Sequence, residues 1–154
     1  MSRRVVIAGL GDSGLLTAIR LARGDIDVVG ISAKPALVSG QELGVRLARP
    51  ADWARDYWIP FERFRGLDRV RTVQAQLTGL DTEARTVLAR AADGSIVTEP
   101  YDALVISTGV TNGFWRQPNL QSANEIGADL QGAHDRLAAA ASIAVIGGGA
   151  AAVS

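Results

Sequence analysis

The sequence predicts an α/β fold with a central parallel sheet, helices on both of its faces and a three-stranded antiparallel meander as a third element. Three observations support this prediction. A short apolar segment at residues 5–8 runs into a glycine-rich turn and then into a helical pattern. Alternating segments between residues 70 and 98 are separated by turn sequences, which favours antiparallel strands. A second apolar segment meets a second glycine-rich turn at residues 143–149.

The first 32 residues are predicted to form one strand–helix–strand unit. Val5–Ala8 is entirely apolar, as expected for a strand that is buried on both faces of a parallel sheet. From Ser13 to Arg23 the apolar residues recur at helical spacing, and Gly24 provides the helix end. Ile26–Ile31 follows as the second strand, so the unit has the usual length of about 30 residues.

The middle of the chain is predicted to contain short helices and then the meander. Residues 52–65 are rich in aromatic side chains and arginine, and they suggest one or two short helices interrupted by Pro60. We expect the aromatic side chains to pack against the core or a lid rather than to stack on nucleic acid, because acidic residues interleave the arginines. Residues 70–80, 84–90 and 95–98 alternate as three successive strands would.

The last third is predicted to contain two more buried strands with a helix between them. Ala103–Ile106 is entirely apolar, and Ser142–Ile146 is apolar after Ser142, as buried parallel strands are. A helix is predicted from Ser122 to Ala141, with His134 facing solvent. Three consecutive glycines, Gly147 to Gly149, follow the second of these strands.

Composition narrows the classes of function. The 154 residues are 47% hydrophobic, which is enough for a packed core. Sixteen basic and sixteen acidic residues balance, so we expect no nucleic-acid partner. With no cysteine and one histidine, we expect no cysteine nucleophile, no His-based triad and no metal site. Redox chemistry would require a bound cofactor, so no catalytic side chain is predicted. The apolar segment near the start is too short for a secretory signal, so a cytoplasmic location is expected.

The first glycine turn matches the dinucleotide-binding pattern G-x-G-x-x-G, between a strand and a helix. Gly9 permits a tight turn, Gly11 lets the backbone approach a pyrophosphate, and Gly14 lets the helix pack close to the strand. The helix N-terminus adds N–H groups and a positive dipole end. The alternative is a glycine-rich turn without a ligand. The predicted cofactor-binding residues here are Gly9, Leu10, Gly11, Asp12, Ser13 and Gly14.

The end of the second predicted strand is where an acidic residue usually binds the adenosine ribose. Ser32 occupies that position, and its hydroxyl can make an uncharged hydrogen bond to the ribose. Lys34 could meet a phosphate. The alternative is that this stretch is only a turn.

Two further motifs follow along the chain. The predicted strand at 103–106 ends in Ser107-Thr108-Gly109, where a backbone turn could lie under a nucleotide. The segment at 143–152 then repeats the strand-plus-glycine pattern as G-x-G-x-x-A, with Ala152 in the close-packing place. A second fingerprint predicts the beginning of a second nucleotide-binding domain.

Together, these three motifs resemble the pyridine-nucleotide-dependent FAD oxidoreductases of glutathione-reductase-like topology. The resemblance implies a Rossmann-like FAD-binding domain over residues 1–140, as the first part of a discontinuous domain, and an NAD(P)H-binding domain that begins at 141–154. The chain is thus expected to be the N-terminal part of a longer protein. Lacking cysteine, it is similar to the branch of type II NADH:quinone oxidoreductases, apoptosis-inducing-factor-like and ferroptosis-suppressor proteins, rather than to the disulfide reductases.

The resemblance implies FAD and NAD(P)H as cofactors, with hydride passing from NAD(P)H to flavin and electrons passing to a quinone-like or protein acceptor. By position, it implies further cofactor contacts from Arg46, Leu77, Thr108, Gly109, Gly147 and Gly149. Arg46 has the alternative of a solvated surface arginine. A peripheral membrane contact and a homodimer stay open.

Other functions stay open beside this one. A flavin-dependent monooxygenase shares the first fingerprint, and a non-catalytic nucleotide-sensing or interaction module would suit the uncharged Ser32. The third alternative is a fragment without activity of its own.

Overall fold

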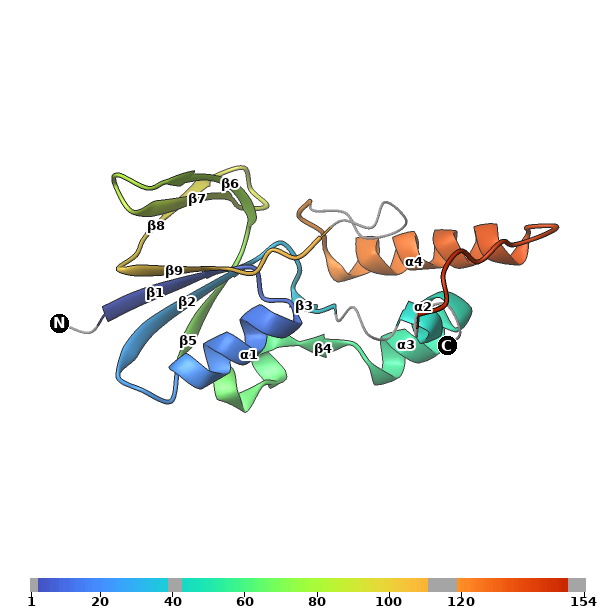
Figure 1. The fold of residues 1–154 in the computed structure, drawn as a ribbon, viewed down its shortest axis with the longest axis horizontal. Coiled ribbons are helices and arrows are strands. Elements are labelled where there is room, and N and C mark those ends of the chain that lie inside the picture. Colours follow the sequence, from blue (N-terminus) through green and yellow to red (C-terminus); the bar gives the residue numbers. More distant parts are fainter. Residues whose placement is uncertain (1–2, 39–42, 111–118, 150–154) are drawn as a thin grey trace.

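The main sheet is parallel, as predicted. The computed structural model describes residues 3–38, 43–110 and 119–149. Four strands pair in parallel in the order β5-β2-β1-β9 (Figure 1). Their bounds are β1 (Arg3–Ala8), β2 (Ile26–Ser32), β5 (Val70–Gln74) and β9 (Ala103–Ile106). The α/β fold class is confirmed.

One face of this sheet is covered by helix α1 (Asp12–Leu21) and by two short 3-10 helices, η1 (Phe61–Arg63) and η2 (Arg65–Leu67). Val5, Ile7 and Val28 of the strands pack there against Leu15 and other buried residues of these helices. Because alternate side chains of a strand point to opposite faces, the intervening apolar residues, such as Val6 and Val29, must be covered on the second face of the sheet.

The meander covers that other face, so the prediction of helices on both faces is wrong. Its strands are β6 (Gln76–Asp81), β7 (Thr86–Arg90) and β8 (Ile96–Pro100), paired antiparallel. Val6 and Val29 of the sheet pack against Val87 and Ala89 of the meander. An apolar strand must be covered on both faces of its sheet, but the covering element can be a second sheet as well as a helix.

The predicted strand at residues 70–80 is in fact two strands, in two different sheets. β5 pairs with β2, and β6 pairs with β7. The break falls at Ala75, which is fully buried and whose N–H donates to the Ser32 carbonyl oxygen at 2.9 Å. Alternation of side chains continues across the break, so it could not reveal that the chain changes sheets.

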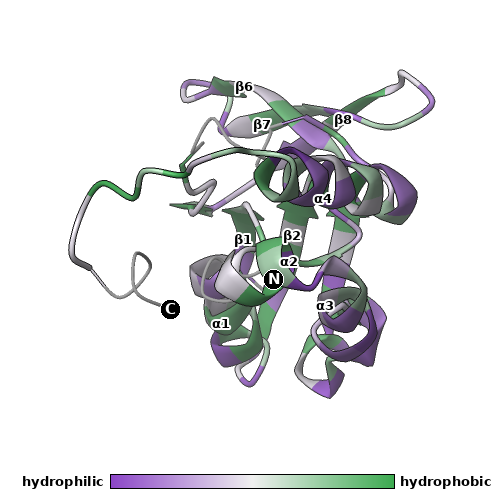
Figure 2. Cartoon of the chain, turned by 90° about the vertical axis from the view of Figure 1, so that its right-hand side faces the viewer, coloured by the Kyte–Doolittle hydropathy of each residue, from purple (hydrophilic) through white to green (hydrophobic). Residues whose placement is uncertain are grey.

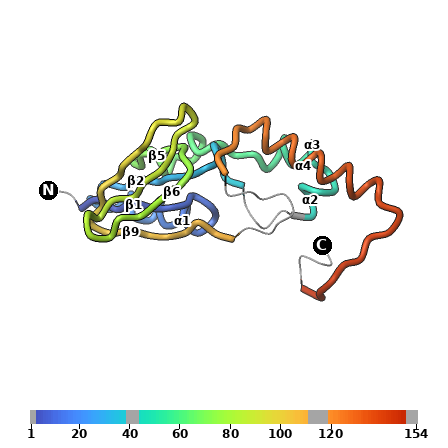
Figure 3. The backbone as a smooth tube through the Cα atoms, turned by 90° about the horizontal axis from the view of Figure 1, so that it is seen from above, coloured from blue at the N-terminus to red at the C-terminus, as the bar shows by residue number. Residues whose placement is uncertain are grey.

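A separate group of helices lies beside the carboxyl end of the parallel sheet (Figures 1 and 3). It contains α2 (Leu43–Ala48), α3 (Pro50–Asp56) and α4 (Ala123–Ala138), and a two-stranded ribbon of β3 (Ala36–Leu37) and β4 (Ile59–Pro60) links it to the sheet. Figure 2 faces this group and shows α4 above α2 and α3. Trp53, Ile126 and Leu130 form its buried centre.

Trp53 and Phe61 of this region pack inside the protein, as predicted, whereas Tyr57 is 44% exposed. Trp53 is 2% exposed, and its ring meets that of Trp58 edge to face at 5.8 Å. Phe61 follows β4 and is buried against α1 and the parallel sheet, not within the helix group. These contacts account for the cluster without a nucleic-acid ligand.

Helix α4 confirms the predicted last helix, and it begins with a reciprocal cap. The N–H of Glu125 donates to the Ser122 hydroxyl, and the Ser122 N–H donates to the Glu125 carboxylate at 2.7 Å. His134 is half-buried rather than solvent-facing, because its Nδ1 donates to the Leu47 carbonyl oxygen at 2.7 Å. No helix in the described ranges is long and apolar enough to cross a bilayer.

The predicted buried strand at residues 142–146 is wrong for this structure. The segment has no strand conformation, and Ile143, Val145 and Ile146 are 58%, 65% and 97% exposed. A parallel strand needs neighbours for its backbone N–H and C=O groups, and none of the described strands pairs with this segment. The predicted boundary at residues 140 and 141 stays a prediction.

Candidate functional site

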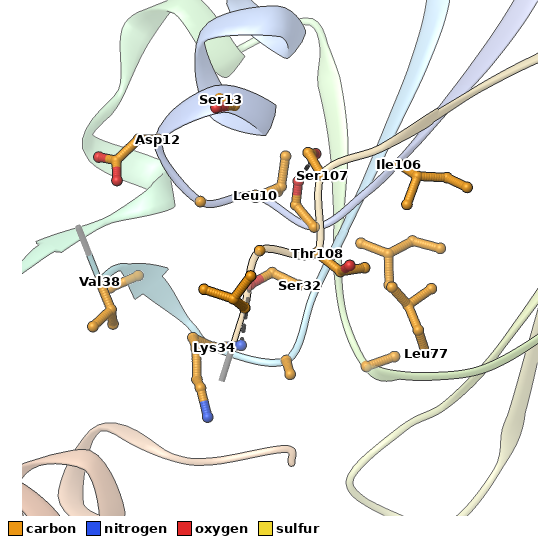
Figure 4. A pocket seen from close by; sticks show the side chains of 18 residues that line it. Leu10, Asp12, Ser13, Ser32, Lys34, Val38, Leu77, Ile106, Ser107 and Thr108 are labelled. Carbon is orange, nitrogen blue, oxygen red and sulfur yellow. Dashed lines mark hydrogen bonds between the residues drawn. The ribbon is translucent and has the colours of Figure 1, made fainter. Parts of the chain in front are cut away.

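A pocket of about 580 Å³ opens where β1, β2 and β9 end at the carboxyl edge of the sheet (Figure 4). Ligands of open α/β sheets bind at this edge, and the volume is typical of cofactor sites. The sequence-predicted residues that line the pocket are Gly9, Leu10, Gly11, Asp12, Ser13, Ser32, Lys34, Leu77, Thr108 and Gly109. The first glycine turn, the turn after β2 and the Ser107–Gly109 segment therefore meet in one place.

Two glycines of the first turn are required by close contacts inside the protein. Gly9 has a φ of +102°, and a Cβ there would lie 2.4 Å from the Ser107 carbonyl oxygen. A Cβ at Gly14 would lie 1.9 Å from the Gly9 carbonyl oxygen. These contacts match the turn and packing roles predicted for Gly9 and Gly14.

Gly11 differs from both of them. Its φ of −74° suits any residue, and a Cβ there would meet nothing within 4 Å. It is also the N-cap of α1, and its carbonyl oxygen accepts the first helical bond, from the Leu15 N–H at 2.8 Å. The N–H groups of the first helical turn have no acceptor within a helix, and they carry its positive dipole end. An open space therefore lies where an anion is favoured.

Ser107 holds this turn against the end of β9. Its hydroxyl donates to the Gly9 carbonyl oxygen at 2.7 Å, and its N–H donates to the Ala8 carbonyl oxygen at 2.8 Å. Sequence reasoning placed Thr108 and Gly109 at the cofactor but omitted Ser107. Ser107 lies one residue before Thr108, at a strand end that faces the glycine turn. This position was the signal that could have identified it as part of the site.

The end of β2 forms a second part of the pocket. Ser32 is 9% exposed, and its Oγ accepts a bond from the Lys34 N–H at 3.1 Å. The Lys34 ammonium donates to the Asn119 carbonyl oxygen at 2.8 Å and to Gln121 Oε1. Figure 4 shows this side chain pointing away from the glycine turn, toward the segment before α4. The proposed phosphate contact of Lys34 stays a prediction.

The pocket continues past Ser32 along an apolar wall. Ala75 and Leu77 contribute from the β5–β6 junction, and Val38 contributes from the region after β3. Of these three residues only Leu77 was predicted, because the alternating pattern of residues 70–80 does not reveal the break between β5 and β6 that brings Ala75 to the pocket. An apolar wall beside a hydroxyl is suited to a flat base next to a sugar.

Arg46 lies outside the pocket lining. It is fully buried in α2, and its guanidinium carbon is 5.6 Å from the centre of the Trp53 ring, a cation–π contact. The alternative of a solvated surface arginine is therefore wrong. Its predicted contact with FAD stays a prediction.

The second glycine motif also lies outside the pocket. Gly147 has a φ of +119°, and a Cβ at Gly147 or Gly149 would meet nothing within 4 Å. Ala152, its third position, lies outside the described residues. Within the described ranges, no three His, Cys, Asp or Glu side chains gather as metal ligands.

No model of a known protein family matches the sequence. The chain is 29% identical over 118 residues to the type II NADH:quinone oxidoreductase NdhA of Mycobacterium tuberculosis. The aligned region covers 73% of this chain and 24% of that protein. The match includes most of the chain but only a quarter of the relative.

Solved structures share the fold. The sulfide:quinone oxidoreductase of Aquifex aeolicus has a TM-score of 0.62 at 22% identity, covering 90% of this chain and 33% of that one. NDH2 of Plasmodium falciparum has a TM-score of 0.66 at 15% identity, covering 94% and 31%. The chain spans about a third of the length of these proteins. In sequence and in fold, the chain is therefore similar to oxidoreductases of the kind that its glycine motifs predict.

Proposed function

We propose that the pocket binds the adenosine diphosphate part of FAD. The observation that carries the proposal is the contrast within the first turn: Gly9 and Gly14 are tightly packed, whereas Gly11 borders open space at the start of α1. Packing alone requires no glycine at position 11. A ligand that must approach the backbone closely does require one.

The residues present fit this group. The N–H groups at the start of α1 would receive the pyrophosphate, and the Ser32 hydroxyl would bond the ribose. Ala75 and Leu77 would contact the adenine. The negative charge of Asp12 lies at the favourable end of the helix dipole, and Figure 4 shows its carboxylate directed away from Ser32 and Thr108. When bound, the flavin accepts a hydride and passes electrons on.

We infer that the whole protein is an NAD(P)H oxidoreductase that reduces a quinone-like or protein acceptor in the cytoplasm. The relative from M. tuberculosis is named as an NADH:quinone oxidoreductase, which supports this inference. The second glycine motif, at residues 147–149, supplies the start of the proposed NAD(P)H-binding domain. The chain's own contribution is to hold and orient the flavin.

FAD binding is tested by the visible absorbance of oxidised flavin in the purified protein and by titration of Gly11→Val. Valine would keep the pyrophosphate off the helix N–H groups, so affinity should fall about 100-fold, the loss of one or two charge-assisted hydrogen bonds. The matched control is Gly127→Val, since Gly127 also has nothing within 4 Å but lies in α4 outside the pocket lining. Unchanged FAD affinity in Gly11→Val, or a colourless protein that binds only NAD(P), would contradict the proposal.

A further inference from the structure

Gln121 is a buried polar residue that joins several elements next to the pocket. It is 6% exposed, although it is an uncharged amide that could face water. Its N–H donates to the Ala33 carbonyl oxygen at 3.0 Å, and its carbonyl oxygen accepts from Gln74 Nε2 at 3.0 Å. Its side chain accepts from the Lys34 ammonium and donates to Asp129 Oδ2 at 2.6 Å. Both backbone groups and both side-chain groups are therefore used.

These partners surround one short turn, residues 32–34, which lines the pocket after β2. Ala33 and Lys34 belong to the turn itself. Gln74 is the residue of β5 that pairs with Ser32, so its side chain links the neighbouring strand to Gln121. Asp129 lies on α4 and fixes the amide from the opposite side. The turn is thus held from the sheet and from the helix group at the same time.

The use of Lys34 in this cluster bears on nucleotide recognition. Its ammonium bonds Gln121 and the Asn119 carbonyl oxygen on the side away from the glycine turn. The Lys34 N–H donates to the Ser32 hydroxyl oxygen, which leaves the hydroxyl hydrogen to be donated elsewhere. A ribose oxygen is a suitable acceptor for that hydrogen.

We propose that Gln121 is a positioning residue that holds the 32–34 turn in the shape that recognises the ribose hydroxyls of an adenine nucleotide. The proposal rests on the proposed function, because it concerns the same pocket. Gln121 does not line the pocket, so it acts through Ala33 and Lys34. Buried polar groups that are fully hydrogen-bonded specify one arrangement of their surroundings.

The test measures discrimination for the ribose hydroxyls, not binding alone. ADP and its dideoxy analogue, which lacks both ribose hydroxyls, are titrated calorimetrically into nucleotide-free protein. We expect the wild type to prefer ADP about fivefold, the effect of one neutral hydrogen bond. Gln121→Met keeps the buried volume but removes the hydrogen bonds to Lys34 and Asp129. This variant should therefore bind ADP and the dideoxy analogue with about equal affinity.

Two variants separate this role from general stability. Ser122→Ala removes the neighbouring helix cap without contacting the turn, so it should lower stability while the fivefold preference remains. If Gln121→Met does not fold, Asp129→Ala tests the same tie from the α4 side, with a partial loss of the preference expected. If Gln121→Met retains the wild-type preference for ADP, the role of Gln121 is overturned while the proposed FAD site is not. Wild-type protein that binds neither nucleotide would overturn the proposed function, and the inference with it.

Discussion

The two glycine turns of this chain share a backbone feature and differ in everything around it. Each follows an apolar segment, and each begins with a glycine at positive φ, +102° at Gly9 and +119° at Gly147. At the first turn, a Cβ on Gly9 or Gly14 would overlap backbone atoms, and the preceding strand is buried between β2 and β9. At the second, a Cβ on any of the three glycines would meet nothing within 4 Å, and the preceding segment is exposed.

The difference shows what a glycine fingerprint specifies by itself. It specifies a local backbone conformation, because positive φ is easily reached only by glycine. It does not specify a binding site. The first turn becomes a pocket only because β2, β9 and α1 supply its walls, and in the described residues the second turn has no comparable neighbours.

The largest expected effect that would test this comparison is at Gly14. A Cβ there would lie 1.9 Å from the Gly9 carbonyl oxygen and 2.6 Å from Ser107 Oγ, so α1 must shift away from the turn. We expect Gly14→Ala to lower the free energy of unfolding by about 3 kcal/mol or more, as for severe overpacking. Urea denaturation followed by circular dichroism measures it. A loss below about 0.5 kcal/mol, the range of neutral surface changes, would show that the contact is not required.

A smaller effect comes from the matched pair Gly9→Ala and Gly147→Ala. Both place alanine at positive φ, but only at Gly9 does the Cβ meet backbone, the Ser107 carbonyl oxygen. We expect a loss of about 2 kcal/mol or more at Gly9, from backbone strain and contact together, and about 1 kcal/mol at Gly147, from backbone strain alone. Chemical denaturation of the two variants gives the difference. Equal losses would mean that the two turns are packed alike.

The smallest expected effect concerns the cap of α4, the helix before the second turn. The Ser122 N–H, and then its hydroxyl, hold the pKa of Glu125 below its ordinary value of 4.5. The folded state therefore favours the carboxylate, so the stabilisation is full above that value and is lost as pH falls through the lower folded pKa. We expect Ser122→Ala to cost about 1 kcal/mol at neutral pH.

The same variant removes the hydroxyl and keeps the backbone N–H, so it should flatten only part of the fall in stability between neutral and acid pH. Denaturation midpoints of wild type and Ser122→Ala across that range provide the measurement. Parallel curves would argue against a role of the Ser122 hydroxyl in acid sensitivity.

The parts of the fold that local patterns determine could be predicted. Val5–Ala8, the first glycine turn and α1 follow from an apolar run, glycine positions and helical spacing, and all are present. The residues that line the pocket from this turn were named for the same reason. What failed depends on contacts between distant segments. The change of sheet at Ala75 and the exposed segment at 143–146 have ordinary strand patterns, and only their neighbours decide their state.

The candidate site shows the same limit. Ser107 and Gln121 carry long-range hydrogen bonds to Gly9 and Lys34, and no periodicity or spacing in the sequence marks either pair. Arg46 was predicted to contact the cofactor, with a solvated surface side chain as the alternative, and packing on Trp53 shows that the alternative is wrong. Residue type predicts the available chemistry, but the packing of helices decides where it is placed.

The hydrogen bond from Ser107 to Gly9 joins residues 98 positions apart in the chain. Between them lie α1, the helices before β5 and the whole meander, so this contact closes a long loop and can form only after those segments have found their places. The pocket should therefore appear late in folding. A nucleotide that binds it would select chains in which the meander is complete, so that loading with cofactor would also report that the N-terminal region has folded.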